Sequence, residues 1–247
     1  VWRLSSLTIA NSGGTLTGQG EWHEKGGKNT HSLHADLKVH DAGVLLTELG
    51  YPNVLQKGNG EASVSLTWDG TPWSPVVSTI EGPVKVSLAN GSFQQVNTGV
   101  GGAVLSLLSM QSLLKRLQLD FSDLVQNGFS FDTLTSESKV VKGVAYTDGT
   151  KVIGSHASII SSGKVDFNTR TIDYDVLVLP DINAAGASIA LAVVNPVAGI
   201  GSLVAQLLLR NPLSKIFSTE YKVQGSFDNP TIEKKSAASK TLEAAEK

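Results

Sequence analysis

The sequence predicts a mainly β fold: a curved antiparallel sheet with helical insertions, in which short apolar helices cover one end of the sheet. Three observations support this prediction. Apolar and polar residues alternate over many short segments, as they do in strands with one buried face. Pairs of Gly, Asn and Asp residues separate these segments, as they do in turns. Two long apolar runs interrupt the strand pattern and have the spacing of helices.

Residues 1–98 are expected to form a first β meander. Gly13 and Gly14 predict a hairpin turn, and the segment SLHADLKVH, residues 32–40, then alternates strictly. Asp41 is the expected N-cap of a short helix, AGVLLTELGY. Alternation returns in EASVSLTWDG and GPVKVSLANGSF, where Asn90 and Gly91 supply a turn signal.

Residues 99–233 are expected to form a second meander that ends in one closing strand, EYKVQGSFDNPTI. Its strands are expected to be joined at three pairs of turn residues: Asp148–Gly149, Ser162–Gly163 and Asn168–Thr169. The remaining residues, 234–247, are polar and rich in Ala, Lys and Glu. We expect them to form a disordered tail.

The second meander carries two apolar helical insertions, at about 100–118 and 184–217. No charged residue lies between Asp181 and Arg210, but Asn195 and Pro196 should start a new helix and divide this run. A single membrane span is therefore not expected there. The helices are expected to cap the sheet or to contact a membrane through eight apolar residues: Leu107, Met110, Leu113, Leu114, Leu117, Ile200, Leu203 and Leu207.

Composition limits the classes of function. The net charge of −2 gives no basic field for nucleic acid, and the absence of cysteine excludes disulfides and Cys-ligated zinc. No nucleophile elbow, P-loop or dinucleotide fingerprint occurs. We therefore expect no catalytic residues and no cofactor. Because the chain begins at Val1 with strand-like sequence, it is interpreted as a fragment of a longer protein.

Two groups of polar residues have features of a functional site. The histidines at 23, 31, 34 and 40 are close in sequence and suggest a metal site. However, His34 and His40 share the polar face of one strand, His23 and His31 are expected in or near a loop, and no carboxylates lie at ligand spacing. No metal site is expected. Asp120 and Asp123 are interpreted as turn and cap residues rather than as a catalytic pair.

The apolar face of such a sheet must be covered, by its own helices or by a ligand. Few of the strand segments carry large aromatic residues, so the lining is mostly Val, Leu and Ile, which suits acyl chains. The expected lining residues are Val64, Leu66, Trp68, Val84, Val86, Leu88, Tyr174, Val176 and Val178. The alternative, an ordinary packed core, stays open at this point.

One long segment resembles a known family. GGAVLSLLSMQSLLKRLQLDFSDLVQNGFSFDTL, from Gly101 to Leu134, is similar to the most recognisable segment of the AsmA-like family in its YhdP-type branch. The similarity continues through KVVKGVAYTDGTKVIGSHASIISSGKVDF and YKVQGSFDNPTI. In the last segment, Phe227 stands where the family usually has Trp. The resemblance spans nearly the whole chain and falls at the carboxy-terminal end of these long proteins.

The resemblance implies a bridge-like lipid transfer protein without catalytic residues. Such proteins are anchored in the bacterial inner membrane by an amino-terminal helix, which is absent here, and cross the periplasm as a taco-like β-groove. It implies that phospholipids move along this groove between the inner and outer membranes, with acyl chains as the partner. Independently of the resemblance, Lys115 and Arg116 at the end of the first expected helix are expected to complement its dipole or to meet lipid phosphates. The delivery end is expected to lie at the outer membrane or at an outer-membrane or periplasmic protein.

A second hypothesis assigns the chain to a different class. In a structural or assembly module that supports outer-membrane biogenesis, the sheet is filled by its own helices and a free strand edge recruits a protein partner. A conduit predicts an apolar groove and bound lipid, whereas the module predicts a filled core.

Overall fold

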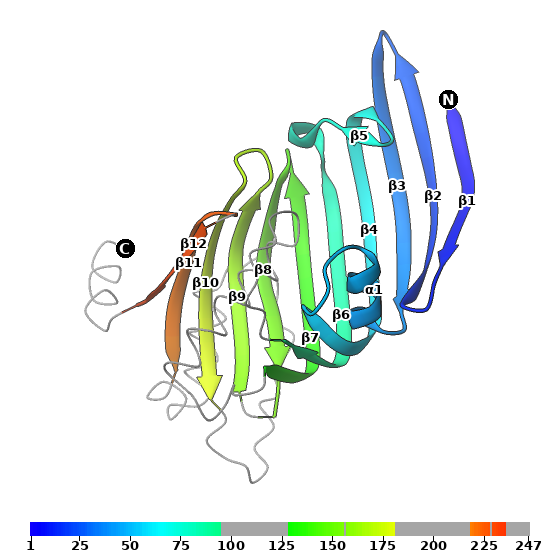
Figure 1. Ribbon diagram of the computed structural model, residues 1–247. Coiled ribbons are helices and arrows are strands. Elements are labelled where there is room, and N and C mark those ends of the chain that lie inside the picture. The colour runs from blue at the N-terminus through cyan, green and yellow to red at the C-terminus, as the bar shows by residue number, and fades with distance from the viewer. Residues whose placement is uncertain (95–127, 156, 181–217, 228, 236–247) are drawn as a thin grey trace.

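The computed structural model describes residues 1–94, 128–155, 157–180, 218–227 and 229–235. The expected helices at 100–118 and 184–217, the eight apolar residues named on them, and the tail from residue 236 lie outside these residues. The described chain forms one antiparallel sheet of twelve strands, in the order β1-β2-β3-β4-β6-β7-β8-β9-β10-β11-β12, with β5 paired to β4 (Figure 1). This confirms the mainly β, antiparallel fold.

Most strands have eight to thirteen residues, and the helical elements are short. The strands are β1 (Trp2–Ala10), β2 (Gly14–Lys25), β3 (Lys28–Val39), β4 (Leu55–Thr71), β5 (Ser74–Pro75), β6 (Gly82–Phe93), β7 (Phe129–Val141), β8 (Val144–Ile153), β9 (Ala157–Asp166), β10 (Thr171–Pro180), β11 (Thr219–Ser226) and β12 (Asn229–Lys234). Among the residues that the structure describes, the helical elements are α1 (Ala42–Glu48) and the 3₁₀ turn η1 (Val77–Thr79).

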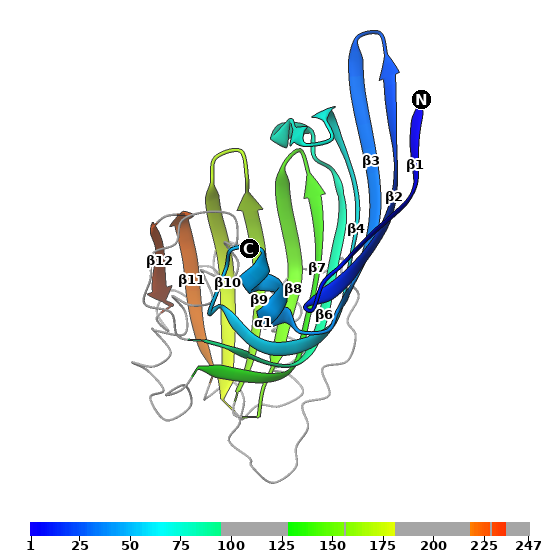
Figure 2. The ribbon, with the colours of Figure 1, turned by 45° about the vertical axis from the view of Figure 1, so that its right-hand side comes forward.

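The sheet is curved, and α1 lies on its hollow side, next to β4 (Figure 2). β6 pairs with β7, so the sheet continues from the expected first meander into the second. Within the described residues, β1 and β12 are the two ends of the sheet.

The helix predicted after Asp41 is present. The Asp41 side chain accepts a hydrogen bond from the backbone N–H of Val44 at 3.0 Å, which satisfies one of the free amide groups of the first turn. Ala42 and Gly43 are buried. A Cβ on Gly58 would lie 3.3 Å from the Ala42 Cβ, so α1 packs closely on β4.

The turn expected at Asn90–Gly91 is wrong, because both residues lie inside β6. Asn90 has a φ of 56°, and the alternation of buried residues shifts by one position at this point. β7 shifts at the same level, between Phe131 and Leu134. The two strands therefore stay paired while their apolar residues remain on one side of the sheet.

Two of the three expected turns in the second half are also wrong. Asp148 and Gly149 lie within β8, where the register with the neighbouring strands shifts, and Ser162 and Gly163 lie within β9. The hairpin between β7 and β8 instead turns at Lys142 and Gly143, with φ values of 51° and 75°. Two residues with positive φ are typical of a type I′ turn.

The remaining turn signals have mixed outcomes. The hairpin at Gly13–Gly14 is confirmed, since the Asn11 side chain accepts from both backbone N–H groups. The turn at Asn168–Thr169 is confirmed as well, between β9 and β10. The closing segment, however, is not one strand: it forms the hairpin of β11 and β12.

The apolar face of the sheet

All nine predicted lining residues lie on one face of the sheet. In the register, Val64 of β4 pairs with Val84 of β6, while Val86 and Leu88 pair with Ala62 and Gly60 of β4. One row of cross-strand neighbours connects these residues to the three lining residues of β10. The row consists of Leu88, Leu134, Val152, Ile159 and Val178. We call this side, which also carries Leu66, Trp68, Tyr174 and Val176, the apolar face. The register places the residues together, and their contact with lipid stays a prediction.

The apolar face is buried to different degrees along the sheet. In β10, Val176 and Val178 are 5% and 1% exposed. In β4 and β6, the lining residues are only half-buried. At the β1 end, Leu4 and Ile9 are 46% and 55% exposed. The face thus grades from a closed core under β8–β11 to an open apolar surface over β1–β6.

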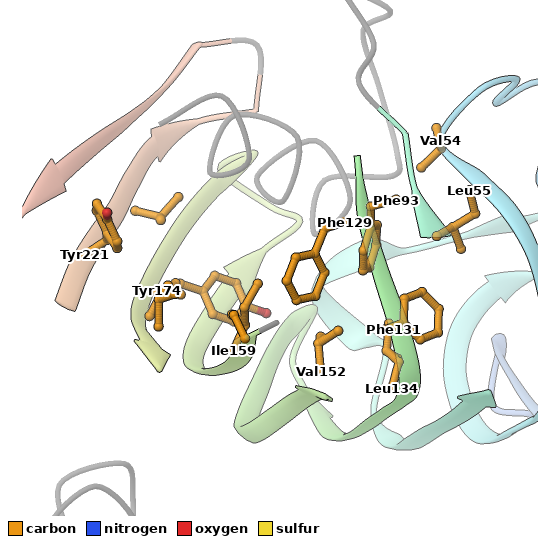
Figure 3. Packing of buried hydrophobic residues seen from close by; sticks show 14 of the residues in the cluster. Val54, Leu55, Phe93, Phe129, Phe131, Leu134, Val152, Ile159, Tyr174 and Tyr221 are labelled. Atoms are coloured by element: carbon orange, nitrogen blue, oxygen red, sulfur yellow. The ribbon is translucent and has the colours of Figure 1, made fainter. Parts of the chain in front are cut away.

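The closed part is a continuous hydrophobic cluster. Phe93, Phe129 and Phe131 pack at one end of it, with the Phe93 and Phe131 rings 5.3 Å apart. Val152, Ile159, Tyr174 and Tyr221 extend the cluster toward β11 on the same side of the sheet (Figure 3). In this part the side chains of the described chain pack against one another, which is what the ordinary-core alternative predicts.

Two hollows lie along strands β1–β7, and residues of both faces of the sheet line each of them. One, of about 910 Å³, is lined by residues 36–39, 59–63, 85–89 and 135–137, from β3, β4, β6 and β7. The other, of about 380 Å³, is lined by segments of β1–β4, including Leu4, Leu33 and Leu66. Val86 and Leu88, both predicted as lining, border the larger hollow.

An aromatic row crosses the apolar face over β1–β4. The ring centroids of Trp2 and Trp22 lie 5.8 Å apart, and His31 lies 5.6 Å from Trp22 and 5.6 Å from Trp68. His31 is therefore not a solvated loop residue as expected: it lies within β3 and is 4% exposed. The prediction failed because the glycines at 26 and 27 form the turn and extend β3 back to Lys28.

His23 and His34 have other partners. His23 contacts Glu21 at 3.2 Å, and His34 contacts the Ser65 hydroxyl at 2.7 Å and Asp36 at 3.3 Å. Within the described part of the chain, no group of three His, Cys, Asp or Glu side chains is placed to hold a metal ion. Asp120, Asp123, Lys115 and Arg116 lie outside the described residues.

The opposite face is mainly polar. On it, the Lys222 ammonium contacts carboxylates of Asp173 and Asp175. Desolvation acts to lower the pKa of Lys222, but these two carboxylates outweigh it and raise the pKa above its ordinary value. An exception is a small second cluster on β9 and β10, formed by Ile160, Leu177 and Leu179. The end of β10 is therefore buried on both faces.

The apolar face also carries a group of hydroxyl residues that was not predicted. Ser136 and Thr150 are hydrogen-bonded at 2.8 Å, and Ser138 and Thr147 at 2.7 Å. Alternation contained a signal for them, since Ser136 and Ser138 have the same parity in β7 as the buried Leu134 and Val140. Their neighbours across the sheet depend on the register, which the sequence did not provide.

No helix within the described residues is long and apolar enough to span a membrane.

Comparison with known proteins agrees with the sequence motifs. The YhdP protein family matches residues 1–232. The chain is 31% identical over 217 residues to the "Intermembrane phospholipid transporter YhdP" of Escherichia coli (strain K12). The aligned region covers 88% of this chain but only 17% of the length of that relative. No solved structure matches the chain. The chain therefore belongs to the YhdP family, the branch of AsmA-like proteins that its motifs predicted.

Proposed function

We propose that this chain is a periplasmic segment of a non-enzymatic conduit, and that the apolar face over β1–β6 carries phospholipid acyl chains between the inner and outer membranes. The observation that carries the proposal is the open, half-buried row of aliphatic residues on that part of the face. The relative from Escherichia coli, described as an intermembrane phospholipid transporter, supports the same role. The proposal includes an anchor in the inner membrane, as the family resemblance implies.

The dimensions of the open part suit an acyl chain. Neighbouring strands lie about 4.8 Å apart, so the five strands β1, β2, β3, β4 and β6 span roughly 19 Å. One leaflet of a bilayer is roughly 15 Å deep in hydrocarbon. A lipid tail laid across these strands is therefore covered along its whole length.

Burial of the tail provides the affinity without a specific polar pocket. Each methylene that leaves water gains roughly 0.8 kcal/mol. Val, Leu and Ala side chains make no directional contacts that would hold a tail in one position. Such a lining retains a lipid and still lets it move along the sheet.

Native mass spectrometry of the purified chain, with extraction and identification of bound lipid, tests the proposal. We expect the chain to carry phospholipid, because the open apolar surface is covered by lipid rather than exposed to water. Removal of the lipid with detergent should leave a chain that takes up phospholipid again from vesicles. A chain that is free of lipid and takes up none would contradict the proposal. It would favour the second hypothesis, in which the edge strands β1 and β12 bind a protein.

A further inference from the structure

Six hydroxyl side chains form a polar band on the apolar face, next to the open part. Ser136 and Ser138 belong to β7, and Thr147 and Thr150 to β8. Ser161 of β9 pairs with Thr150, and Tyr174 of β10 reaches Thr147 across Gly163, which pairs with both. We call the six residues the hydroxyl belt. It begins one strand beyond the row of Val84, Val86 and Leu88.

The belt has more hydrogen-bond donors than it uses. The six hydroxyls make three hydrogen bonds with one another: Ser136 with Thr150, Ser138 with Thr147, and Thr147 with Tyr174. Each hydroxyl has one proton to donate, so three donors have no acceptor among the described residues. Desolvation raises the pKa of Tyr174, although the hydrogen bond with Thr147 acts in the opposite direction. The phenol therefore remains a donor at neutral pH.

Ser161 supplies one of these free donors. The residue as a whole is 9% exposed, and the described residues give its hydroxyl no hydrogen-bond partner. The oxygen atom itself is not among the buried polar atoms that lack a partner, so it is accessible from outside. A ligand that brings acceptor oxygens to the belt can therefore accept a hydrogen bond from it.

The belt is uncharged, which limits the kind of acceptor that fits. Alternation places Glu137, Lys151 and Lys164 on the opposite face of the same strands. A phosphate moved to this part of the apolar face would have no cation beside it, and burial of an unpaired charge is costly. Neutral ester carbonyls accept hydrogen bonds without that cost.

We infer that the hydroxyl belt binds the ester carbonyl oxygens of a diacyl lipid whose tails lie across β1–β6. This inference rests on the proposed function and adds a position and an orientation to it. The tails cover the open apolar surface, the glycerol esters lie over β7–β9, and the charged headgroup stays outside the belt. The belt would then give the sliding lipid a preferred resting point.

A competition between lipids with and without ester carbonyls tests the inference. The purified chain is offered an equal mixture of a diacyl phosphatidylethanolamine and its dialkyl ether analogue with the same tails. Native mass spectrometry then measures the ratio of the two bound lipids. One net hydrogen bond corresponds to roughly a fivefold preference for the diacyl lipid. The variant Thr150→Val/Ser161→Ala should bind both lipids equally, and Thr135→Val, an exposed position on the opposite face of β7, should keep the preference.

The outcomes separate this inference from the proposed function. Equal binding of both lipids by the unaltered chain would overturn the hydroxyl belt as a carbonyl site and leave the conduit in place. Binding of neither lipid would overturn both. Diacylglycerol, which keeps the esters and lacks the phosphate, should compete as well as the phospholipid; if it fails to compete, the belt recognises phosphate and the inference is wrong. If the double variant does not fold, Ser161→Ala alone is measured.

Discussion

Replacement of Val64 by aspartate is expected to remove most bound lipid from the chain. Val64 lies in the middle of β4, with Ala35 and Val84 as its neighbours on the apolar face. An Asp placed in a hydrocarbon environment costs about 2.5–3.5 kcal/mol, which corresponds to a loss of roughly a hundredfold in lipid affinity. Because Val64 is only half-buried by protein, the lipid-free chain should fold with little loss of stability.

Asn59→Asp is the matched control for this variant. Asn59 is exposed on the opposite face of the same strand, and the substitution adds the same charge with almost no change in shape. Lipid retention by the two variants is compared after extraction, and folding is checked by circular dichroism. Equal retention by Val64→Asp and Asn59→Asp would mean that the apolar face of β4 does not contact lipid.

Replacement of Tyr221 by alanine is expected to destabilise the chain by about 3–5 kcal/mol, the usual cost of truncating a buried aromatic side chain. Tyr221 is 0% exposed and belongs to the hydrophobic cluster. It pairs with Val176 of β10. The cavity left by the ring lies in the closed part of the apolar face, where other residues of the hydrophobic cluster surround it. Urea denaturation measures the loss of stability.

Gln224→Ala on the same strand is the control, because Gln224 is exposed and surface substitutions usually change stability by less than about 0.5 kcal/mol. The effect of Tyr221→Ala should be the same in lipid-loaded and lipid-stripped chain. A loss below about 1 kcal/mol, or a loss that appears only after lipid removal, would show that lipid fills this part of the face as well.

Much of the sheet follows from alternation alone. The period of two puts Val64, Leu66 and Trp68 on one side of β4, and the structure keeps them there. The cap at Asp41 is similarly local, since its carboxylate bonds an amide only three residues away. Features that depend on the nearest few residues were predicted correctly.

The errors in the turns have a different cause. Asn90–Gly91, Asp148–Gly149 and Ser162–Gly163 have turn composition, yet each lies within a strand. Residues that adopt positive φ serve a turn and a strand irregularity equally well. Gly91, for example, leaves room for the Phe131 ring, whose Cζ would lie 2.4 Å from a Cβ at that position. Only the pairing of β6 with β7 distinguishes the two uses.

The candidate site was predicted only in part, again because strand pairing cannot be derived from local sequence. Parity identified which residues share the apolar face, but the amount of cover at each strand depends on neighbours that are distant in sequence. Val178 is buried while Val86 is half-buried, although both are valines in alternating strands. The burial of Leu177 and Leu179 on the opposite face could have been predicted from the sequence. The run VLVL is apolar on both sides, as in a strand that is covered on both faces.

Photocrosslinking from Val86 tests most directly whether the apolar face binds lipid. A photoreactive amino acid is placed at Val86, which is half-buried on the apolar face, and in a separate variant at Ser87, the next residue, which is exposed on the opposite face. After irradiation in cells, mass spectrometry identifies the attached molecules. The proposed conduit predicts phospholipid attached at Val86 and none at Ser87. Equal labelling at both positions, or protein attached at Val86 in place of lipid, would contradict it.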